Sequence, residues 1–534
     1  MRKGFSKDLI ARILPNAKYT VVELEEKFPA RDLPEGAIVT RFAPSPTGFM
    51  HIGGLYSSLI GRKLASQTGG VWYLRIEDTD TAREKEGMVD LIIDSLKAFG
   101  IQADEGSIGT DITSGDYGPY YQTQRKDIYH SVAADLLERG FAYPCFLTQS
   151  EMDEIRENQK LNGLMTGIYG EYAKWRDADE GEIATRLETG EVPSIRLYST
   201  GNKEHKIFCK DEVRGSMVLP ENNDDIVLIK STDGLPTYHF AHLCDDHFMR
   251  STHIVRAEEY FSTFPLHIQM FNMMDWNAPR YIHTTTLDKI DDENSGQRKL
   301  SKRKDPEASV RYFMEQGWPT EAVLEYIFNV LNPTYEEDKT KGRLKDIWGA
   351  ELKIKKLPKS SALFDMKKLE WWAREFVANL PGTELAKRVT DWAEKYGNDF
   401  EKSEVADMDY LTRILSIERS DQKRVRKDFF AWRQTLSEIA FFFDNGQDFA
   451  CSIASLAYHK EILKEFLQSF DIKDQKDVWW NKITQIASEI GIKNAEAAMV
   501  LRIAVTGRTM TPDLYSVMDV MGEVKVRERI ERLL

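Results

Sequence analysis

Cysteine is scarce in this chain, and long apolar runs are missing from it. Four cysteines occur in 534 residues, at positions 145, 209, 244 and 451, and none forms a Cys-x-x-Cys pair. The spacing therefore gives no support to a disulfide framework or a zinc ribbon. The sequence has no run of about 18 apolar residues, and Met1–Phe5 is not followed by the apolar core of a secretory signal. We expect a cytoplasmic protein that makes no use of a membrane.

A surplus of positive charge is also missing, which at first argues against a nucleic-acid partner. The formal net charge is −14, and binding to phosphates needs lysine and arginine. Net charge is an average, however, and a binding face needs only a local surplus. Two clusters of basic residues supply a local surplus of positive charge, at 298–304 and 423–427. An isolated run of this kind is, however, commonly a solvated surface.

The pattern of apolar residues near the start of the chain predicts an α/β unit. The length indicates three or four domains. An apolar strand at 37–42 precedes a loop with two prolines at 43–48, a helix at 54–67 and a second strand at 71–76. This strand–helix–strand order predicts parallel strands, and the ligands of such sheets bind beyond the carboxyl ends of the strands. From about residue 306 the chain is helical by period.

The tetrapeptide His51-Ile52-Gly53-Gly54 opens the predicted helix after the first strand and its loop. Small residues there let a nucleotide lie close to the backbone, and a helix N-terminus favours phosphate. A histidine beside it can donate to phosphate oxygens as charge develops in a transition state. The same residues also fit an ordinary strand-to-helix turn with a capping histidine, so the tetrapeptide alone does not decide between the two.

A second motif, Lys299-Leu300-Ser301-Lys302-Arg303-Lys304, follows a polar loop at 291–297. A basic loop suits a triphosphate because ammonium groups neutralise the β and γ phosphates as pyrophosphate leaves. Taken alone, the motif reads equally as a basic surface run. The two motifs together, in this order and in an α/β context, indicate an enzyme that activates a carboxylic acid with ATP.

The two motifs resemble the HIGH and KMSKS signatures of class I aminoacyl-tRNA synthetases. Neighbouring segments narrow the resemblance to the glutamyl-tRNA synthetases, namely those at 41–48, 75–80, 233–239, 245–247 and 256–259. Glutaminyl enzymes share the scaffold but typically read Pro-Glu-Pro where this chain has Pro44-Ser45-Pro46. The resemblance runs from about residue 37 to the C-terminus, and it is dense up to about residue 310.

This resemblance implies a multidomain protein with an α/β Rossmann-type catalytic domain, an inserted α+β acceptor-binding domain and an all-α C-terminal half. The implied segments are an N-terminal extension at 1–36, a split catalytic domain at 37–126 and 223–305, an inserted acceptor-stem-binding domain at 127–222, a stem-contact domain at 306–376 and a helical anticodon-binding region at 377–534. The sequence assigns no role to the extension.

The resemblance also implies a set of site residues. Those expected to bind glutamate are Arg41, Ala43, Ser45, Glu77, Tyr238, His242 and Arg256. Those expected to bind ATP are His51, Gly53, Gly54, Glu259, Leu287, Lys299, Ser301, Lys302 and Arg303, with His51 and Lys302 as the catalytic pair. Arg41 and Tyr238 are expected to hold the γ-carboxylate, since a guanidinium pairs with a carboxylate through charge-assisted hydrogen bonds. The charged members also fit ordinary ion pairs at a domain seam.

The implied reaction has two steps and uses L-glutamate, ATP with Mg²⁺, and tRNA(Glu). The α-carboxylate attacks the α-phosphate, and a ribose hydroxyl at the 3′ end of the tRNA then attacks the glutamyl-adenylate. Members of the family usually need tRNA before activation proceeds, and they are often monomers. No zinc is expected, because Tyr143–Leu147 offers only Cys145 where zinc-binding relatives begin with Cys-x-Cys.

In the helical half, Leu501–Gly507 resembles the anticodon-binding segment of the family. Arg502 is then expected to contact an anticodon base, although it equally fits a helix-surface arginine. The arginine that excludes the glutamine anticodon in some members could align with Arg426, Lys427 or Asp428. The use of tRNA(Gln) as a second acceptor therefore stays open.

Two other classes of protein share parts of this pattern. A small-molecule nucleotidyltransferase also uses HIGH-like turns, but such enzymes are usually short and lack the long helical half. A non-enzymatic tRNA-binding paralogue is expected to have lost a catalytic side chain, whereas His51 and Lys302 are both present. Two positions depart from the family pattern: His242 stands where asparagine is familiar, and Tyr260 where tryptophan is common.

Overall fold

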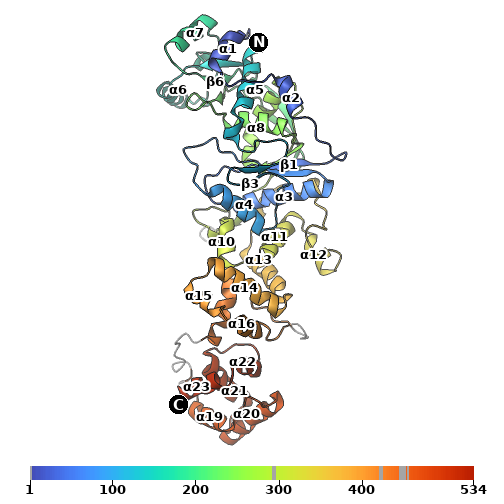
Figure 1. Ribbon diagram of the computed structural model, residues 1–534, viewed down its shortest axis with the longest axis vertical. Coiled ribbons are helices and arrows are strands. Elements are labelled where there is room, and N and C mark those ends of the chain that lie inside the picture. Colours follow the sequence, from blue (N-terminus) through green and yellow to red (C-terminus); the bar gives the residue numbers. More distant parts are fainter. Residues whose placement is uncertain (1–2, 292–295, 420–424, 444–452, 454–455) are drawn as a thin grey trace. The chain divides into compact units, whose positions relative to one another are not determined.

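The computed structural model describes residues 3–291, 296–419, 425–443, 453 and 456–534, and the chain divides into two compact units (Figure 1). The first unit comprises 1–311 and 327–364, and the second comprises 312–326 and 365–534. The predicted stem-contact segment at 306–376 is thus shared between the units, and the finer segmentation stays a prediction. None of the described helices has the length and apolar character needed to cross a membrane.

The predicted strand–helix–strand unit is present. β1 (Val39–Phe42) and β2 (Val71–Leu74) pair in parallel, with α3 (Ile52–Thr68) between them in the chain. The helix starts two residues before the expected position because His51 caps it, and it stops at Gly69, where φ is +66°. After α4 (Met88–Ala98), β3 (Glu105–Gly109) pairs in parallel with β2, and β4 (Ile112–Ser114) turns back antiparallel.

A second parallel pair belongs to another sheet and lies beside β1. β10 (His253–Ala257) pairs in parallel with β11 (Arg280–Thr284). The backbone N–H of Thr252, just before β10, donates to the carbonyl of Val39 in β1 at 2.9 Å. The carboxyl ends of β1, β2, β10 and β11 therefore lie along one edge, as the sequence predicted for a ligand-binding edge.

The segment at 127–222 adds helices and antiparallel strands to the first unit. Its elements, with the strand and helices that follow it, are α5 (Lys126–Glu138), β5 (Ala142–Cys145), α6 (Gln149–Leu161), α7 (Glu180–Glu188), β6 (Ser194–Leu197), β7 (Lys206–Asp211), β8 (Gly215–Pro220), β9 (Val227–Ile229), α8 (Tyr238–Phe248) and α9 (Phe264–Met273). β5, β6 and β9 form one antiparallel sheet. β7 and β8 form a hairpin, and Asp211 at the end of β7 pairs with Tyr281 of β11.

The residues before β1 are part of the core of the first unit. α1 (Lys7–Ile13) and α2 (Val21–Lys27) bury Leu9, Ile10 and Leu24 in the cluster that also holds the apolar faces of α5 and α8. Ser6 bonds Glu180 of α7, whereas Arg31 forms a two-fold bond with Glu105 of β3 at 2.7 and 3.0 Å. These residues therefore connect the segment at 127–222 to the parallel sheet.

Truncation of Leu24 tests this packing. Leu24 is fully buried on a seven-residue helix, and Leu24→Ala should lower the free energy of unfolding by about 2–3 kcal/mol, since a short surface helix relaxes partly around the cavity. Denaturant unfolding measures the change. Val22→Ala is the matched control, because Val22 lies on the same helix and is 67% exposed. Equal effects of the two substitutions would show that α2 is not packed as described.

A small sheet and short helices complete the first unit. β12 (Leu287–Ile290) pairs with β13 (Gln297–Lys299) and with β14 (Ala362–Leu363). α12 (Tyr335–Thr340) follows α10 (Val310–Gln316) and α11 (Thr320–Leu331), which run across the limits of the two units. The backbone N–H of Val310 donates to the carbonyl of Met50 at 3.0 Å. This bond brings the chain that follows the lysine-rich motif next to His51.

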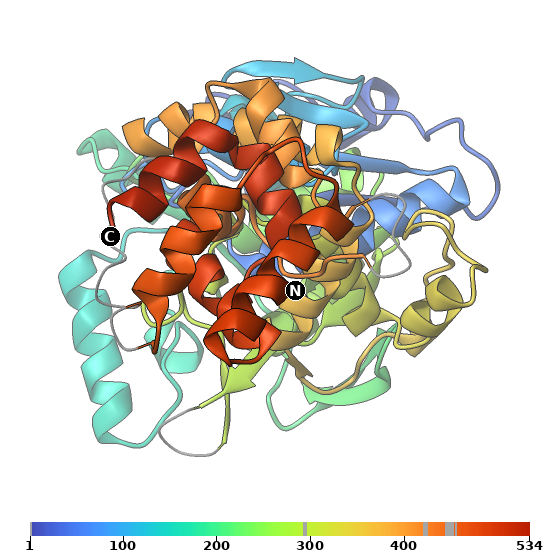
Figure 2. The same cartoon turned by 90° about the horizontal axis from the view of Figure 1, so that it is seen from below.

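The second unit is helical, as the periodicity predicted. Its further helices are α13 (Met366–Ala378), α14 (Gly382–Tyr396), α15 (Asp399–Glu404), α16 (Met408–Leu415), α17 (Trp432–Ile439), α19 (His459–Ser469), α20 (Lys476–Ile490), α21 (Asn494–Thr506), α22 (Leu514–Met521) and α23 (Glu523–Glu531) (Figure 2). One apolar cluster runs through α14 to α23, with Leu385, Leu436 and Leu501 among its buried members.

Candidate functional site

A cavity of 350 Å³ lies at the carboxyl edge of β1, β2, β10 and β11. Its lining includes many of the residues that the sequence marked for glutamate and ATP: Arg41, Ala43, His51, Gly53, Gly54, Glu77, Tyr238, Arg256, Glu259, Leu287 and Lys299. The fold therefore brings the two motifs, some 250 residues apart in the sequence, to one site. The edge is the one where a parallel sheet of this kind binds ligands.

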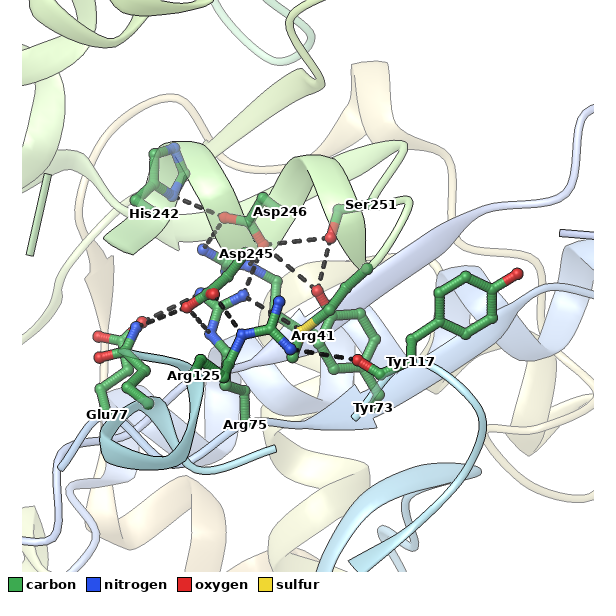
Figure 3. A network of polar contacts seen from close by, with 12 residues as sticks. Arg41, Tyr73, Arg75, Glu77, Tyr117, Arg125, His242, Asp245, Asp246 and Ser251 are labelled. Atoms are coloured by element: carbon green, nitrogen blue, oxygen red, sulfur yellow. Dashed lines mark hydrogen bonds and ion pairs between the residues drawn. The ribbon is translucent and has the colours of Figure 1, made fainter. Parts of the chain in front are cut away.

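Buried charges form the floor of this site (Figure 3). Asp246 of α8 accepts hydrogen bonds from Arg41 (Nε to Oδ1, 2.9 Å; Nη2 to Oδ2, 3.2 Å) and from Arg75 (Nη1 to Oδ1, 2.9 Å). Asp245 accepts from Nε of Arg125 at 2.6 Å. Burial alone would raise the pKa of Asp246, but Arg41 and Arg75 hold it well below its usual value. Such a network persists only because each charge has a partner.

Glu77 extends the network to the cavity wall. Nη2 of Arg75 donates to Oε1 of Glu77 at 3.1 Å, and the Glu77 backbone N–H donates to the carbonyl of Pro44 at 3.0 Å. Burial raises the pKa of Glu77 against the opposing charges of Arg75 and Arg41. The carboxylates of Asp245, Asp246 and Glu77 thus balance the buried guanidinium groups of Arg41, Arg75 and Arg125.

Arg256 differs from these arginines because it has no carboxylate partner within the described part of the chain. Its Nε donates to Nε2 of His283 at 2.9 Å, its Nη1 lies 3.0 Å from Nδ1 of His267, and its Nη2 donates to the carbonyl of Tyr260 at 3.5 Å. The side chain is buried, and its guanidinium lies 4.7 Å from the ring centre of Tyr281. Arg256 therefore brings a positive charge to the cavity wall with no carboxylate in contact with it among the described residues.

Two tyrosines form an aromatic wall beside Arg256. The rings of Tyr238 and Tyr260 lie 5.3 Å apart, and both residues line the cavity. Burial first, and then the charge of Glu77, raise the pKa of the Tyr238 phenol, so this hydroxyl stays protonated and can donate a hydrogen bond. Tyr260 keeps an aromatic side chain at the position where the sequence departs from the family pattern.

The His51 turn presents helix α3 to the cavity. His51 is the N-cap of α3, and its Nδ1 accepts from the backbone N–H of Gly53 at 3.0 Å. Burial, and then the charges of Lys302 and Lys299, lower the pKa of His51 to about 4. A neutral imidazole with Nδ1 engaged carries its hydrogen on Nε2. A Cβ at Gly54 would lie 3.3 Å from the ring of Phe42, so the chain is tightly packed there.

The lysine-rich loop lies against this turn. Lys302 donates from Nζ to the carbonyl of Phe49, and Lys299 forms an ion pair with Glu259 at the cavity wall. Burial lowers the pKa of Lys302. Asp305, which the sequence did not single out, holds the loop: its Oδ2 accepts from the backbone N–H of Ser301 at 2.9 Å, and both its oxygens accept from Arg298.

Several of the marked residues do not line the cavity. Ser45 is exposed in the proline loop, and Ser301, Lys302 and Arg303 lie on the lysine-rich loop outside the lining, with Lys302 and Arg303 exposed. His242 is fully buried. Its Nδ1 lies 2.6 Å from Oδ2 of Asp246 and its Nε2 lies 3.0 Å from the hydroxyl of Tyr281, so each of its nitrogens has a protein oxygen close by.

Some residues that line the cavity were not marked by the motifs or by the resemblance. Thr284 ends β11, Thr285 and Thr286 follow it at the cavity, and Tyr56 and Ser57 face the cavity from the first turns of α3. The threonines could have been found, because a run of hydroxyl side chains directly after a buried strand marks the carboxyl edge of a parallel sheet. Tyr56 and Ser57 carried no such signal, since they fit the helical period of α3.

In the second unit, Arg502 of α21 is half-buried, and its Nη1 donates to the carbonyls of Thr511 and Pro512 at 3.2 and 3.1 Å. The basic cluster at 423–427 lies partly outside the described residues, which exclude Lys423 and Arg424. Arg426 pairs with Asp428, and Lys427 with Glu375 at 2.6 Å. The described part of the cluster is therefore not a purely positive surface.

The pH dependence of stability should report on His239, which is half-buried behind Tyr238. Burial, followed by the charge of Arg256, lowers the pKa of His239 from 6.5 to about 4. The unfolded chain therefore binds more protons between these values, so the free energy of unfolding falls as the pH is lowered through the window. His239→Gln should make this fall shallower in denaturant unfolding across the window. The exposed His205→Gln is the control and should keep the wild-type slope; identical slopes for all three proteins would contradict a neutral His239.

Comparisons with known proteins agree with this geometry. Residues 37–371 match the family described as tRNA synthetases class I (E and Q), catalytic domain, and residues 384–534 match an anticodon binding domain. The chain is 40% identical to a glutamate–tRNA ligase of Clostridium perfringens, with 98% of each chain covered. It is also 40% identical to one of Acetivibrio thermocellus, covering 99% of this chain and 100% of the relative.

A solved structure shares the fold. It is that of a glutamate tRNA ligase from Elizabethkingia meningosepticum in complex with its amino acid, with a TM-score of 0.76 and 25% identity over 93% of this chain and 99% of that one.

Proposed function

The chain belongs to the class I glutamate–tRNA ligases, and from that premise we propose that it joins L-glutamate to tRNA(Glu) through a glutamyl-adenylate. The charge of Arg256, which no carboxylate of the described residues contacts, is the observation that carries the choice of substrate. An amino acid with a second carboxylate adds the negative charge that this cavity lacks. A neutral side chain would leave a buried cation without a partner, which is costly.

In this proposal the cavity holds glutamate by complementary charges. Glu77 binds the α-ammonium group, and Arg256 binds the γ-carboxylate. Arg41 contributes through Nη1, because Asp246 occupies Nε and Nη2, whereas Nη1 has only a long 3.4 Å contact with the carbonyl of Val255. The protonated hydroxyl of Tyr238 is a further donor for the γ-carboxylate. The buried ion-pair network holds the side chains of Arg41 and Glu77 in place before glutamate binds. Little side-chain entropy is therefore lost on binding.

Activation takes place where the two motifs meet. The N-terminus of α3 with Gly53 and Gly54 accommodates ATP, and Mg²⁺ accompanies ATP and neutralises phosphate oxygens. Nε2–H of His51 and the ammonium groups of Lys302 and Lys299 stabilise the charge that grows on the departing pyrophosphate. The Lys299–Glu259 pair must open for Lys299 to do so. No covalent enzyme intermediate is required, and the chain acts by positioning and charge stabilisation.

The acceptor is placed by the remaining segments. We assign 127–222 to the acceptor stem of the tRNA, and the helical unit, whose residues 384–534 match an anticodon binding domain, to the anticodon. Arg502 is already bound to the carbonyls of Thr511 and Pro512, so a contact to a base would use its other guanidinium nitrogens. We also propose that activation depends on tRNA.

A charging assay tests the proposal. Glutamate, glutamine and aspartate are offered separately with tRNA(Glu) and tRNA(Gln) transcripts. We expect transfer of glutamate to tRNA(Glu) and rejection of the other two amino acids. Transfer of glutamate to both transcripts would show that tRNA(Gln) is a second acceptor, whereas no transfer to either would refute the ligase. Pyrophosphate exchange at full rate without tRNA would refute the dependence on tRNA.

A further inference from the structure

The structure assigns a positioning role to His267 and His283, which hold Arg256 as neutral hydrogen-bond acceptors, with Asp211 fixing the tautomer of His283. This inference rests on the proposed function, since it concerns how the binding site for glutamate is kept in shape. The three side chains come from α9, β11 and β7, and each is at least 99% buried. None of them was marked by the motifs.

The hydrogen-bond geometry determines where each hydrogen lies. An arginine can only donate, so Nε2 of His283 and Nδ1 of His267 must both carry lone pairs toward Arg256. A neutral imidazole has one donor and one acceptor nitrogen. His283 therefore has its hydrogen on Nδ1, which lies 2.9 Å from Oδ2 of Asp211. His267 has its hydrogen on Nε2, which lies 3.0 Å from Nδ1 of His239.

Asp211 is itself fixed by the backbone. Its Oδ1 accepts from the N–H groups of Val213 and Arg214 at 3.0 and 2.8 Å, and its Oδ2 accepts from the N–H of His283 at 3.0 Å. These donors favour the carboxylate, and the pKa of Asp211 is lowered although burial alone would raise it. The carboxylate in turn fixes the ring of His283, as a carboxylate does for a metal-binding histidine.

Neutral hydrogen-bond acceptors can orient Arg256 without neutralising its charge. A carboxylate beside Arg256 would orient its guanidinium but also cancel its charge, as Asp246 does for Arg41. Imidazole nitrogens orient the same donors without adding a negative charge. Burial is the first cause that lowers the pKa of both His267 and His283, so the rings stay neutral. Arg256 is thereby held in one orientation, and its positive charge remains available to a carboxylate of the substrate.

Paired substitutions separate this role from simple packing. His267→Leu and His283→Leu remove the acceptors. His267→Asn and His283→Gln keep an oxygen at the position of Nδ1 and of Nε2, respectively. In charging of tRNA(Glu), each leucine variant should raise the KM for glutamate roughly 10- to 100-fold, since a buried donor is left unpaired, with the KM for ATP and kcat changed about 3-fold or less. The amide variants should stay within about 5-fold of the wild type.

His253→Leu is the matched control. His253 is a buried histidine of β10, the strand of Arg256, and its Nδ1 bonds the neighbouring Thr252 at 2.9 Å. Its removal should leave the KM for glutamate unchanged. Equal defects in the leucine and amide variants, or a parallel rise in the KM for ATP, would overturn the inference. A wild-type chain that transfers no glutamate would refute the proposed function, and the inference would fall with it.

If the leucine variants do not fold, the tautomers of His267 and His283 in the wild type still test the inference. Nitrogen-15 spectra of the imidazoles distinguish the two tautomers and the protonated ring. We expect a protonated Nδ1 in His283 and a protonated Nε2 in His267, with a single hydrogen on each ring at neutral pH. The opposite tautomer in either ring, or a doubly protonated ring, would remove that histidine as an acceptor for Arg256 and overturn the inference.

Discussion

Lys302→Ala should slow the transfer of glutamate to tRNA roughly 100- to 1,000-fold, which corresponds to a loss of about 3–4 kcal/mol of transition-state stabilisation. Lys302 already donates to the carbonyl of Phe49, two residues before His51, so its ammonium group is held at the turn where the triphosphate would lie. The charge on pyrophosphate grows during the reaction, and an ammonium group that acts on it affects kcat more than the binding of substrates.

Steady-state charging of tRNA(Glu) with varied ATP measures this effect. Lys97→Ala is the control, since Lys97 is an exposed lysine on α4 outside both motifs, whereas Lys302 donates to the carbonyl of Phe49 beside the His51 turn. It should keep the wild-type rate. A Lys302→Ala enzyme with unchanged kcat and unchanged KM for ATP would remove Lys302 from the mechanism, and one with unchanged kcat but a raised KM for ATP would restrict it to binding in the ground state.

Asp246→Asn should lower the free energy of unfolding by about 3–5 kcal/mol. The substitution keeps the size of the side chain and removes the one charge shared by Arg41 and Arg75, which then lie buried beside each other with a partner missing. Asp246 also lies 2.6 Å from Nδ1 of His242 and 3.1 Å from the hydroxyl of Ser251. An amide cannot accept from all of these donors, so the loss extends beyond one ion pair.

Denaturant unfolding of the two proteins measures the loss. Asp153→Asn is the control, because Asp153 pairs with Arg156 on an exposed face of α6, where removal of one charge has little effect. A loss for Asp246→Asn as small as that of the control would mean that water already reaches the network. Asp246→Asn should also weaken glutamate binding, since Arg41 would lose the bonds that direct it.

The parts of the site that depend on local sequence were predictable. Apolar runs placed β1 and β2, and the spacing of His51, Gly53 and Gly54 placed the turn between them, because these features are set within a few neighbouring residues. The resemblance to class I synthetases then predicted that Lys299 and Lys302 act at the same site. The helical half followed from its period of apolar positions, with Leu436 and Leu501 in the core as expected for amphipathic helices.

The parts that depend on pairing between distant residues were not predictable from the pattern. Asp246 lies 205 residues from Arg41 in the sequence, and no spacing rule connects an acidic pair on a helix with arginines on other elements. The same holds for Asp211 and His283, which are 72 residues apart. The residues before β1 are a further case: the sequence assigned them no role, and nothing local indicated which surface Leu9, Ile10 and Leu24 cover.

The contact at the end of β7 limits how segments can be exchanged between related chains. β7 lies within the segment at 127–222, yet its last residue, Asp211, bonds His283 of β11 beneath the cavity. A chimera that replaced this segment with that of a relative would therefore exchange more than the segment that we propose to bind the acceptor stem. Unless the donor sequence also brings a carboxylate to position 211, the graft would change the hydrogen bonding of His283 and, through it, of Arg256, which lies outside the exchanged segment.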